Sequence, residues 1–458
     1  MHEVTRMTRM TRISALALGV VGALAAGNVA ASGFRINENS AKGMGRAFAG
    51  SAVSTGDGAV VANNPAAMSG TDQNTFQTSV TWIDLDADFT GSGTAAAGSP
   101  LASPLRGGNG GDPSDAAAVP ATSAIFPVHE ASGLTIGAMI SAPFGLKTKW
   151  EDGWVGRYNA ITSEVTVIDL TLSAAIDITD RFSVGVGFIY ERAEVTLSND
   201  IDFGSGICAL SIALCTTPTP ATATFGPQKN DGRVVVEGDD TGIGFVAGLQ
   251  WRPTDNLTIG YSHRSEIDHN LTGNADFTGV PAIVASSGRF SDSAVSAPLT
   301  LPSIDTLSAM YRINDDFALM ADASRTGWSS LRDVTINFAN PRQGSTVEPF
   351  NWDDTMFYSL GGEWAMSDRF TFRAGVAFDE TPTNDVTRTP RLPDADRTWL
   401  SAGVTWNANE TLSIDAGFTH IMVDDPTING VRSSSGSTLT GSFDASANLF
   451  GVGAQYRF

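Results

Sequence analysis

A run of alternating residues at the C-terminal end is the feature that most constrains the fold of this sequence. Apolar side chains occupy every second position, and small or polar residues stand between them. A period of two places successive side chains on opposite faces of a β-strand. A last strand with one aromatic face is typical of an outer-membrane β-barrel. The apolar positions are Phe450, Val452, Ala454, Tyr456 and Phe458.

The first 31 residues are typical of a secretory signal peptide. Arg6, Arg9 and Arg12 precede an uncharged stretch at 13–26, and small residues follow up to Ala31. This order matches a basic region, an apolar core and a cleavage site. No later stretch offers the roughly 18 consecutive apolar residues of a spanning helix. We therefore expect cleavage after Ala31 and export of the mature chain without a helical anchor.

The composition favours a barrel over a soluble enzyme with a large core. The chain has 48 glycines and a mean hydropathy of -0.01, which suits strands that alternate between lipid and lumen. Its net charge is -21. Because a nucleic acid would be repelled by such a charge, we expect no nucleic-acid partner.

The two-residue alternation recurs along the chain, for example at 369–379, where the even positions are apolar and the odd ones mostly polar. Short turns rich in Asn, Asp, Pro and Ser alternate with long loops rich in Gly, Ser, Thr and Pro. This asymmetry predicts an all-β, 14-stranded antiparallel transmembrane barrel at 75–458. The expected strands cover 75–89, 121–129, 133–142, 162–178, 182–197, 240–252, 257–272, 298–313, 316–338, 351–366, 369–379, 396–407, 410–424 and 445–458.

The segment at 32–74 precedes the first expected strand and shows no sustained alternation. One interpretation is a disordered periplasmic tail. Its apolar residues favour an N-terminal hatch that folds inside the barrel as a plug, because disordered segments carry few such residues.

Several short motifs are spread along the whole mature chain. They are Gly33 to Glu38, Gly43 to Phe48, Asn64, Pro65 and Ala66 in the hatch, then Pro143 to Leu146 and Leu392 to Arg397. In this order they resemble the FadL/TodX family of outer-membrane transporters for long-chain fatty acids and hydrocarbons. The resemblance implies a 14-stranded barrel closed by an N-terminal hatch, and passive uptake of hydrophobic molecules. It also implies capture between the extracellular loops and lateral release through a kink in the third strand.

The kink of the third strand is expected at Pro143 and Gly145. Proline donates no ladder hydrogen bond, so a strand that contains it bends away or leaves a neighbour unpaired. The alternative is that Pro143 only ends the strand. We predict a lateral portal here.

A hydrophobic ligand needs a dry pocket with few polar groups. Aromatic residues of barrels also form interfacial girdles, so each candidate has that alternative role. The candidates for ligand binding are Phe34, Phe48 and Met68 on the hatch, Phe144 and Leu146 at the kink, and Trp150, Trp154 and Tyr158 after it.

A fatty-acid carboxylate would favour a cation in the pocket. The resemblance implies basic residues at the positions of Leu197 and Asp353, and neither residue is basic. Arg192 and Arg373 lie in matching motifs and are the candidates in their place, although lumenal arginines also pair with acidic residues. Long-chain fatty acids are the favoured substrate. Neutral hydrocarbons, or an open porin or adhesin barrel, are the alternatives.

Cys208 and Cys215 lie close together in a long loop of an exported chain, which predicts a disulfide. Neither has a nearby His that would suggest a metal site. The sequence shows no recognisable catalytic set of Ser, His and acid. We expect no enzymatic activity and no cofactor.

The expected location is the outer membrane of a Gram-negative bacterium. The partners expected there are outer-membrane lipid and lipopolysaccharide, and the barrel assembly machinery through the strand that ends in Phe458. The resemblance suggests a monomer.

Overall fold

The computed structural model describes residues 33–54, 56–114, 116–129, 133–216 and 225–458. The signal peptide predicted at 1–31 lies outside these residues. Among them, no helix has the length and hydropathy needed to cross a membrane.

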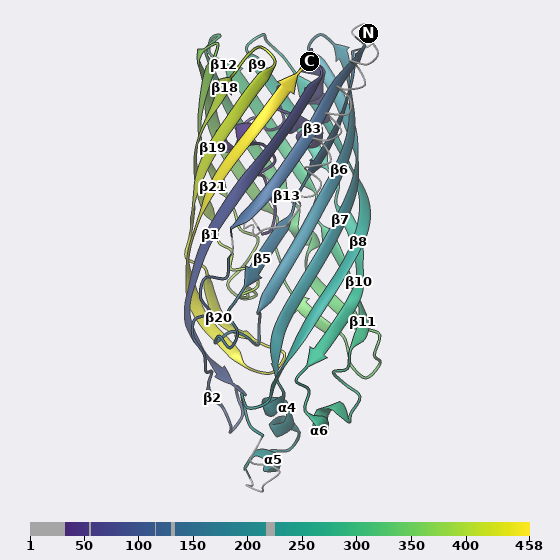
Figure 1. Cartoon of the computed structure of the whole chain (residues 1–458), viewed down its shortest axis with the longest axis vertical. Coiled ribbons are helices and arrows are strands. Elements are labelled where there is room, and N and C mark those ends of the chain that lie inside the picture. Colours follow the sequence, from purple (N-terminus) through teal and green to yellow (C-terminus); the bar gives the residue numbers. More distant parts are fainter. Residues whose placement is uncertain (1–32, 55, 115, 130–132, 217–224) are drawn as a thin grey trace, which may run out of the picture.

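The strands form one closed antiparallel barrel of 14 strands, as predicted (Figure 1). The ring closes between β1 (Thr75–Ala95) and β21 (Thr438–Arg457), which pair over nearly their whole length. Some wall strands are interrupted and carry two labels. In chain order, the wall continues as β3 (Ala117–His129), β4 (Leu134–Ser141) with β5 (Gly145–Lys149), β6 (Thr162–Thr179), β7 (Phe182–Asp202), β8 (Asp231–Trp251), β9 (Leu257–Arg264) with β10 (Ile267–Thr278), β11 (Ser293–Leu301) with β12 (Ile304–Arg312), β13 (Phe317–Thr326) with β14 (Asp333–Phe338), β16 (Thr355–Ser367), β17 (Phe370–Asp379), β18 (Arg397–Asn407) and β19 (Leu412–Val423).

The predicted alternation sets the two faces of the wall. On β17, Phe372, Val376 and Phe378 point outward and are exposed, whereas Arg373 between them is buried in the lumen. The outer apolar side chains suit lipid, and the inner polar ones suit a filled lumen.

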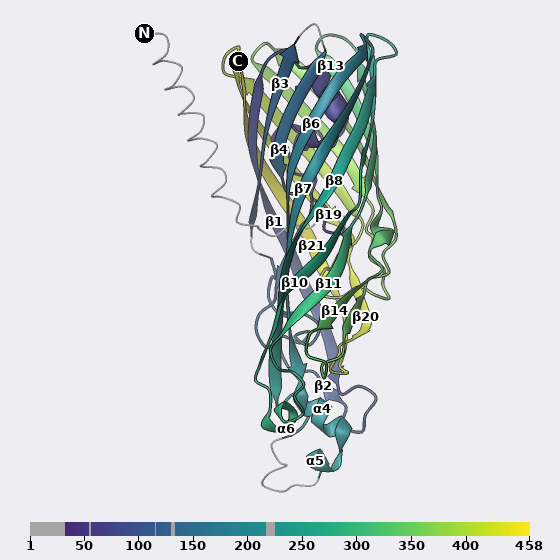
Figure 2. The ribbon, with the colours of Figure 1, turned by 90° about the vertical axis from the view of Figure 1, so that its right-hand side faces the viewer.

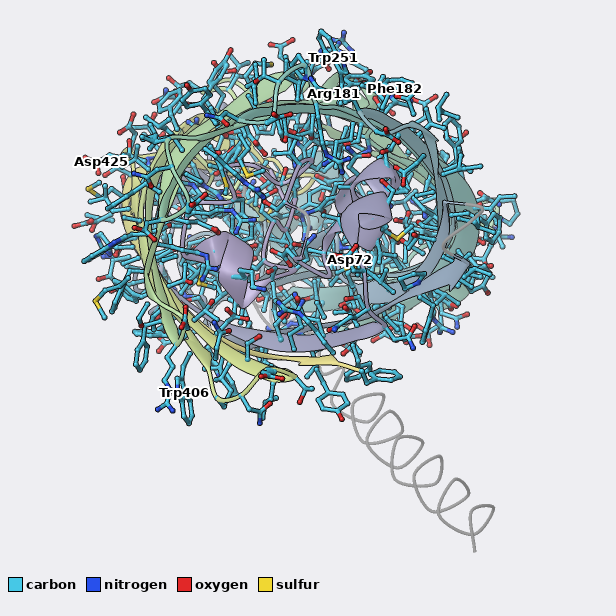
Figure 3. The ribbon with its side chains drawn as sticks, turned by 90° about the horizontal axis from the view of Figure 1, so that it is seen from above. Asp72, Arg181, Phe182, Trp251, Trp406 and Asp425 are labelled. Atoms are coloured by element: carbon cyan, nitrogen blue, oxygen red, sulfur yellow. A yellow bond between two sulfur atoms is a disulfide. The ribbon has the colours of Figure 1, made fainter. Side chains whose placement is uncertain are left out.

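Residues 33–74, here called the lumenal segment, lie inside the ring of strands (Figure 3). They contain α2 (Ala41–Met44), α3 (Val60–Asn63) and the 3-10 helix η1 (Pro65–Gly70). Met44, Val61 and Met68 of this segment are fully buried against the wall. The position of the segment agrees with the predicted hatch.

The two ends of the barrel differ (Figures 1 and 2). Short turns join strands at the end that holds the C-terminus. The other end carries β2 (Ser103–Pro104), α4 (Phe203–Leu210), α5 (Ala213–Thr216), α6 (Ala282–Ala285), β15 (Thr346–Pro349) and β20 (Thr427–Arg432). We take the short-turn end as periplasmic and the loop end as extracellular.

Several strands run further toward the extracellular end than predicted. β7 and β8 extend into the region 199–239, and β21 begins at Thr438, where loops were expected. Backbone pairing continues there without an apolar outer face, because main-chain hydrogen bonds do not depend on the side chains.

Candidate functional site

The wall is incomplete beside the kink in the third strand. β4 ends at Ser141 and β5 begins at Gly145, with Pro143 between them. β3 pairs with β4 only from Thr122 onward, and β5 pairs with β6. The stretch 117–121 of β3 therefore pairs with β1 alone. We call the space between this stretch and β5 the wall gap.

The lumenal segment pairs with the kink by main-chain hydrogen bonds. The N–H of Ile36 donates to the carbonyl of Pro143 at 2.8 Å, and the N–H of Gly145 donates to the carbonyl of Phe34 at 2.8 Å. Arg35 and Phe144 form an antiparallel bridge. These contacts are those of a short added strand. The lumenal segment is thus tied to the kink at both Phe34 and Ile36.

Apolar side chains gather where the segment meets the kink. The ring of Phe34 lies 4.7 Å from that of Trp328, 5.8 Å from that of Trp352 and 6.0 Å from that of Phe144, between centroids. We call this buried group the Phe34 cluster. Its members include Phe34, Phe144, Leu146, Val167, Ala193, Leu271, Leu299, Leu301, Trp328, Leu331, Trp352 and Leu392, with Val165 and Val195 packed against it.

The structure brings together only part of the predicted binding set. Phe34, Phe144 and Leu146 meet, but Phe48 packs against Trp399 in a neighbouring cluster and Met68 lies in a third cluster on the β3 and β4 wall. Trp150 and Trp154 stack on each other with centroids 4.2 Å apart, beside Phe89 and Phe443. Tyr158 donates its hydroxyl hydrogen to Asp231.

Sequence reasoning missed Trp328 and Trp352. Both fall inside the strands expected at 316–338 and 351–366, but in the structure Trp328 follows the end of β13 and Trp352 precedes the start of β16. Strand alternation therefore does not set the direction of either side chain. Their fully or nearly buried position was the only available signal, and it needs the fold.

The open space beside the kink is small, and charged side chains form part of its lining. A cavity of about 90 Å³ lies next to Pro143, and its lining includes Arg35, Asp169, Arg264 and Asp322. A site for a drug-sized ligand has roughly 300–1,000 Å³. The apolar side chains of the Phe34 cluster are packed on one another.

Below the Phe34 cluster lies a compensated charge network. The guanidinium of Arg264 contacts Asp169 at 2.5 Å and Glu191 at 2.6 Å, and His269 contacts Glu191 at 3.0 Å. These groups are buried or nearly so, and mutual pairing offsets the cost of removing them from water.

A second network fixes the lumenal segment from the periplasmic side. Arg46 of the segment contacts Asp57 at 3.5 Å and Glu363 of β16 at 3.0 Å. Glu363 also accepts a hydrogen bond from Arg373 at 2.7 Å. Arg373 therefore lies in the lumen, as expected, but its charge is engaged by Glu363 rather than free for a ligand.

The expectation that Arg192 serves a lumenal ligand is wrong. Its side chain is 53% exposed on the outer face of β7, where it pairs with Glu194 at 2.7 Å and Asp239 at 3.4 Å. Glu191 and Ala193 on either side point inward. The strand alternation thus carries Arg192 away from the lumen.

The Asn64, Pro65 and Ala66 motif attaches the segment to the wall. The Asn64 side chain donates to the carbonyls of Ala52 at 2.7 Å and Leu249 at 3.0 Å, and accepts from the Ala66 N–H at 3.1 Å. A side-chain carbon at Gly248 would lie 1.9 Å from the Asn64 oxygen, so this close approach requires glycine.

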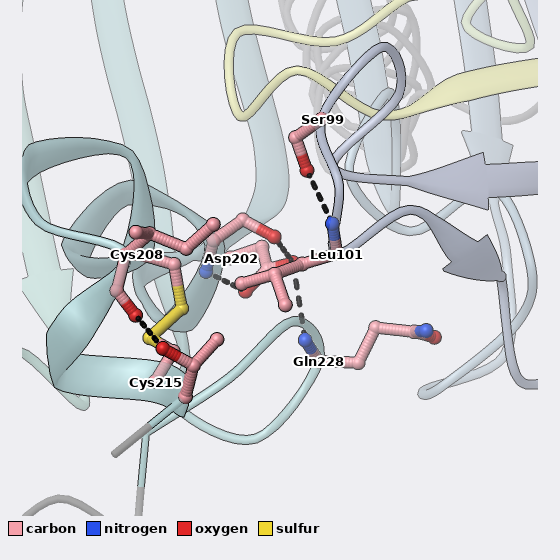
Figure 4. Close-up of a disulfide and its surroundings, with 9 residues drawn as sticks. Ser99, Leu101, Asp202, Cys208, Cys215 and Gln228 are labelled. Atoms are coloured by element: carbon pink, nitrogen blue, oxygen red, sulfur yellow. Dashed lines mark hydrogen bonds between the residues drawn. A yellow bond between two sulfur atoms is a disulfide. The ribbon is translucent and has the colours of Figure 1, made fainter.

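The extracellular end carries an apolar groove beside the predicted disulfide. Cys208 of α4 and Cys215 of α5 are joined, and Leu101 of another loop lies nearby (Figure 4). The groove has a volume of about 580 Å³, and its lining includes Leu101, Leu210 and Ile212. Leu210 is 87% exposed. The groove therefore exposes apolar side chains at the extracellular end of the barrel.

Glu38 is a buried acid of the lumenal segment. Burial raises the pKa of Glu38 to about 7, with backbone N–H groups and Arg397 opposing the shift and Asp379 adding to it. A raised acid pKa favours the packed state most below the ordinary value of about 4.5. That stabilisation is lost as the pH rises from there through 7.

We therefore expect amide hydrogen exchange at 34–39 to speed up between pH 5 and pH 8, after correction for the intrinsic rate. Glu38→Gln should flatten the profile, because the amide does not titrate. If exchange in Glu38→Gln depends on pH as it does in the wild type, another group causes the pH dependence.

The fold and the site define a class of protein: an outer-membrane barrel whose lumen is filled by its own N-terminal segment and whose wall is interrupted beside it. Residues 22–458 match the profile of the family described as outer membrane protein transport protein (OMPP1/FadL/TodX). The chain belongs to this family, and its location is the outer membrane of a Gram-negative bacterium.

Relatives of this chain include two curated outer-membrane proteins and one solved structure. The chain is 29% identical to outer membrane protein P1 of Haemophilus influenzae, over 95% of this chain and 97% of that one. It is 28% identical to the long-chain fatty acid transport protein of Escherichia coli K12, over 88% and 91%. A crystal structure of a Pseudomonas aeruginosa FadL homologue superposes with a TM-score of 0.84, at 28% identity, over 93% of this chain and 100% of that one. The family consists of transporters, which agrees with the expectation of no enzymatic activity.

Proposed function

We propose that the protein carries long-chain fatty acids passively across the outer membrane. In this scheme the extracellular groove captures the ligand, the Phe34 cluster receives it, and the wall gap releases it sideways. The observation that carries the proposal is the pairing of Phe34 and Ile36 with Gly145 and Pro143. One short stretch of chain thereby holds both the apolar cluster and the gap closed.

The physical reason for such a route is the low solubility of acyl chains in water. A wet lumen offers no favourable environment for methylene groups, whereas burial against apolar side chains is worth about 0.8 kcal/mol per methylene. The side chains of Ala117, Val119 and Ile36 line the wall beside the gap and are buried together. Lateral exit would keep the acyl chain of the ligand out of the polar network around Arg264.

Uptake by living cells tests this function. Cells that lack their own transporter and express this chain should take up labelled oleate faster than cells with the empty vector. A labelled alkane is the matched neutral ligand. Uptake of the alkane alone would favour the hydrocarbon alternative, and uptake of neither would contradict hydrophobic transport.

A further inference from the structure

Arg391 is a buried cation without an acidic partner. Its side chain belongs to the loop between β17 and β18 and is 7% exposed. Within the described part of the chain, the other buried arginines all contact a carboxylate; they are Arg46, Arg157, Arg373, Arg388 and Arg397. An isolated buried charge is costly, so its retention needs a reason.

The contacts of the Arg391 guanidinium are all with neutral oxygens. It donates to Ser163 Oγ at 3.2 Å, to Asn199 Oδ1 at 3.1 Å and to the carbonyls of Thr162 at 3.4 Å and Ser198 at 3.5 Å. Bonds between a guanidinium and a carboxylate are shorter, about 2.7–2.9 Å. Burial lowers the pKa of Arg391, and only Glu348 acts against this shift, without forming an ion pair.

An apolar track leads from Arg391 to the kink. Ser163 pairs with Leu197, the next inward pair is Val165 with Val195, and then Val167 with Ala193. Leu146 pairs with Val165, and the Val167 N–H donates to the Phe144 carbonyl. The track from Ser163 to Val167 covers about 13 Å of strand. Its residues are Phe144, Leu146, Val165, Val167, Ala193 and Val195.

We propose that Arg391 receives the carboxylate of an acyl-chain ligand whose tail lies along this apolar track toward the wall gap. The inference rests on the proposed function and specifies its substrate class as an amphiphile with one carboxylate. The planar guanidinium can donate two parallel hydrogen bonds to such a head group. The tail replaces contacts that Phe34 makes in the closed state.

The loop keeps its shape without this guanidinium. The Arg391 carbonyl accepts from Thr148 Oγ1 at 3.0 Å, and the Pro390 carbonyl accepts from Trp150 Nε1 at 3.0 Å. Both contacts use the main chain of the loop. Substitution of the side chain is therefore compatible with an intact loop.

Equilibrium binding of labelled oleate and labelled oleyl alcohol to the purified full chain tests the proposal. Arg391→Gln should weaken oleate binding by about 10- to 100-fold while oleyl alcohol binding stays within about twofold. Arg391→Lys should recover only part of the oleate affinity, because an ammonium keeps the charge but lacks the planar pair of donors. Arg181→Gln is the matched control, because that arginine is exposed in a periplasmic turn.

Unchanged oleate binding in Arg391→Gln, or equal loss of both ligands, would overturn the assignment of the head-group residue. Failure of the wild-type chain to bind either ligand would contradict the proposed function itself. Heat-modifiable migration in gels checks that each variant has assembled its barrel.

Discussion

Arg46→Met should produce a steady conductance in planar bilayers, where we expect the wild-type barrel to be nearly silent. The Arg46 side chain is 1% exposed and holds Asp57 of the lumenal segment and Glu363 of the wall. Removal of one partner from a buried ion pair costs roughly 3–5 kcal/mol, because the remaining charges lose their compensation. The lumenal segment should then loosen and admit water and ions to the lumen. Single-channel recording measures the change.

Arg181→Met is the control for charge loss, since Arg181 pairs with Asp255 at the exposed periplasmic surface. Its conductance should equal that of the wild type. The double variant Arg46→Met with Glu363→Gln should lose less stability than the sum of the losses in the two single variants. Such non-additivity is expected for groups in one ion-pair network. An assembled Arg46→Met barrel that stays silent would show that other contacts, such as those of Asn64, suffice to seat the segment.

The barrel was predictable because lipid-facing and lumen-facing side chains alternate with a period of two along each strand. The run at 369–379 defined a lipid face and a lumen face, and the structure keeps both. The extracellular ends of β7, β8 and β21 were not predicted, because there both faces meet water and the alternation disappears. The break between β9 and β10 was also missed. There the Ser265 side chain accepts the Phe245 N–H in place of a ladder partner, and such a local exchange leaves no periodic sign.

Only part of the candidate site was predictable from the sequence motifs. Phe34 and Phe144 were both candidates for the lining of the ligand pocket, and their rings meet in the structure. Arg192 was proposed as a cation for the ligand carboxylate because it lies in a matching motif, without regard to the direction of its side chain. The inward direction of Ser183, Gly185 and Gly187 already implied that the odd positions of β7 face the lumen, so Arg192 had to face outward. The direction of a side chain on its strand therefore says more about whether it can reach a lumenal ligand than the motif to which the residue belongs.

Contacts made by the loops could not be predicted from the sequence. Arg391 follows Pro390 in a stretch without periodicity, so the sequence gives neither its burial nor its neighbours. Its contacts with Ser163 and Asn199 join residues more than 190 positions apart. Such contacts depend on the closure of the whole barrel, which no local pattern specifies.

Pro143→Val is expected to close the wall gap and to reduce oleate uptake strongly. Valine supplies the N–H that proline lacks and favours an extended backbone. The strand could then continue from β4 along the free side of 117–121 in β3. One added ladder bond at roughly 0.5–1.5 kcal/mol would lower the open population of the gap by about 2- to 13-fold. The initial rate of labelled oleate uptake measures this effect.

Pro127→Val is the matched control, since Pro127 lies in β3 at a position already paired with Thr135 of β4. Its uptake should equal that of the wild type. Oleate binding to purified Pro143→Val should persist, because capture and the apolar track lie on the extracellular side of the kink. Normal uptake by an assembled Pro143→Val barrel would rule out release through this gap. Loss of binding together with uptake would place the defect in capture, so the two measurements separate arrival of the ligand from its lateral exit.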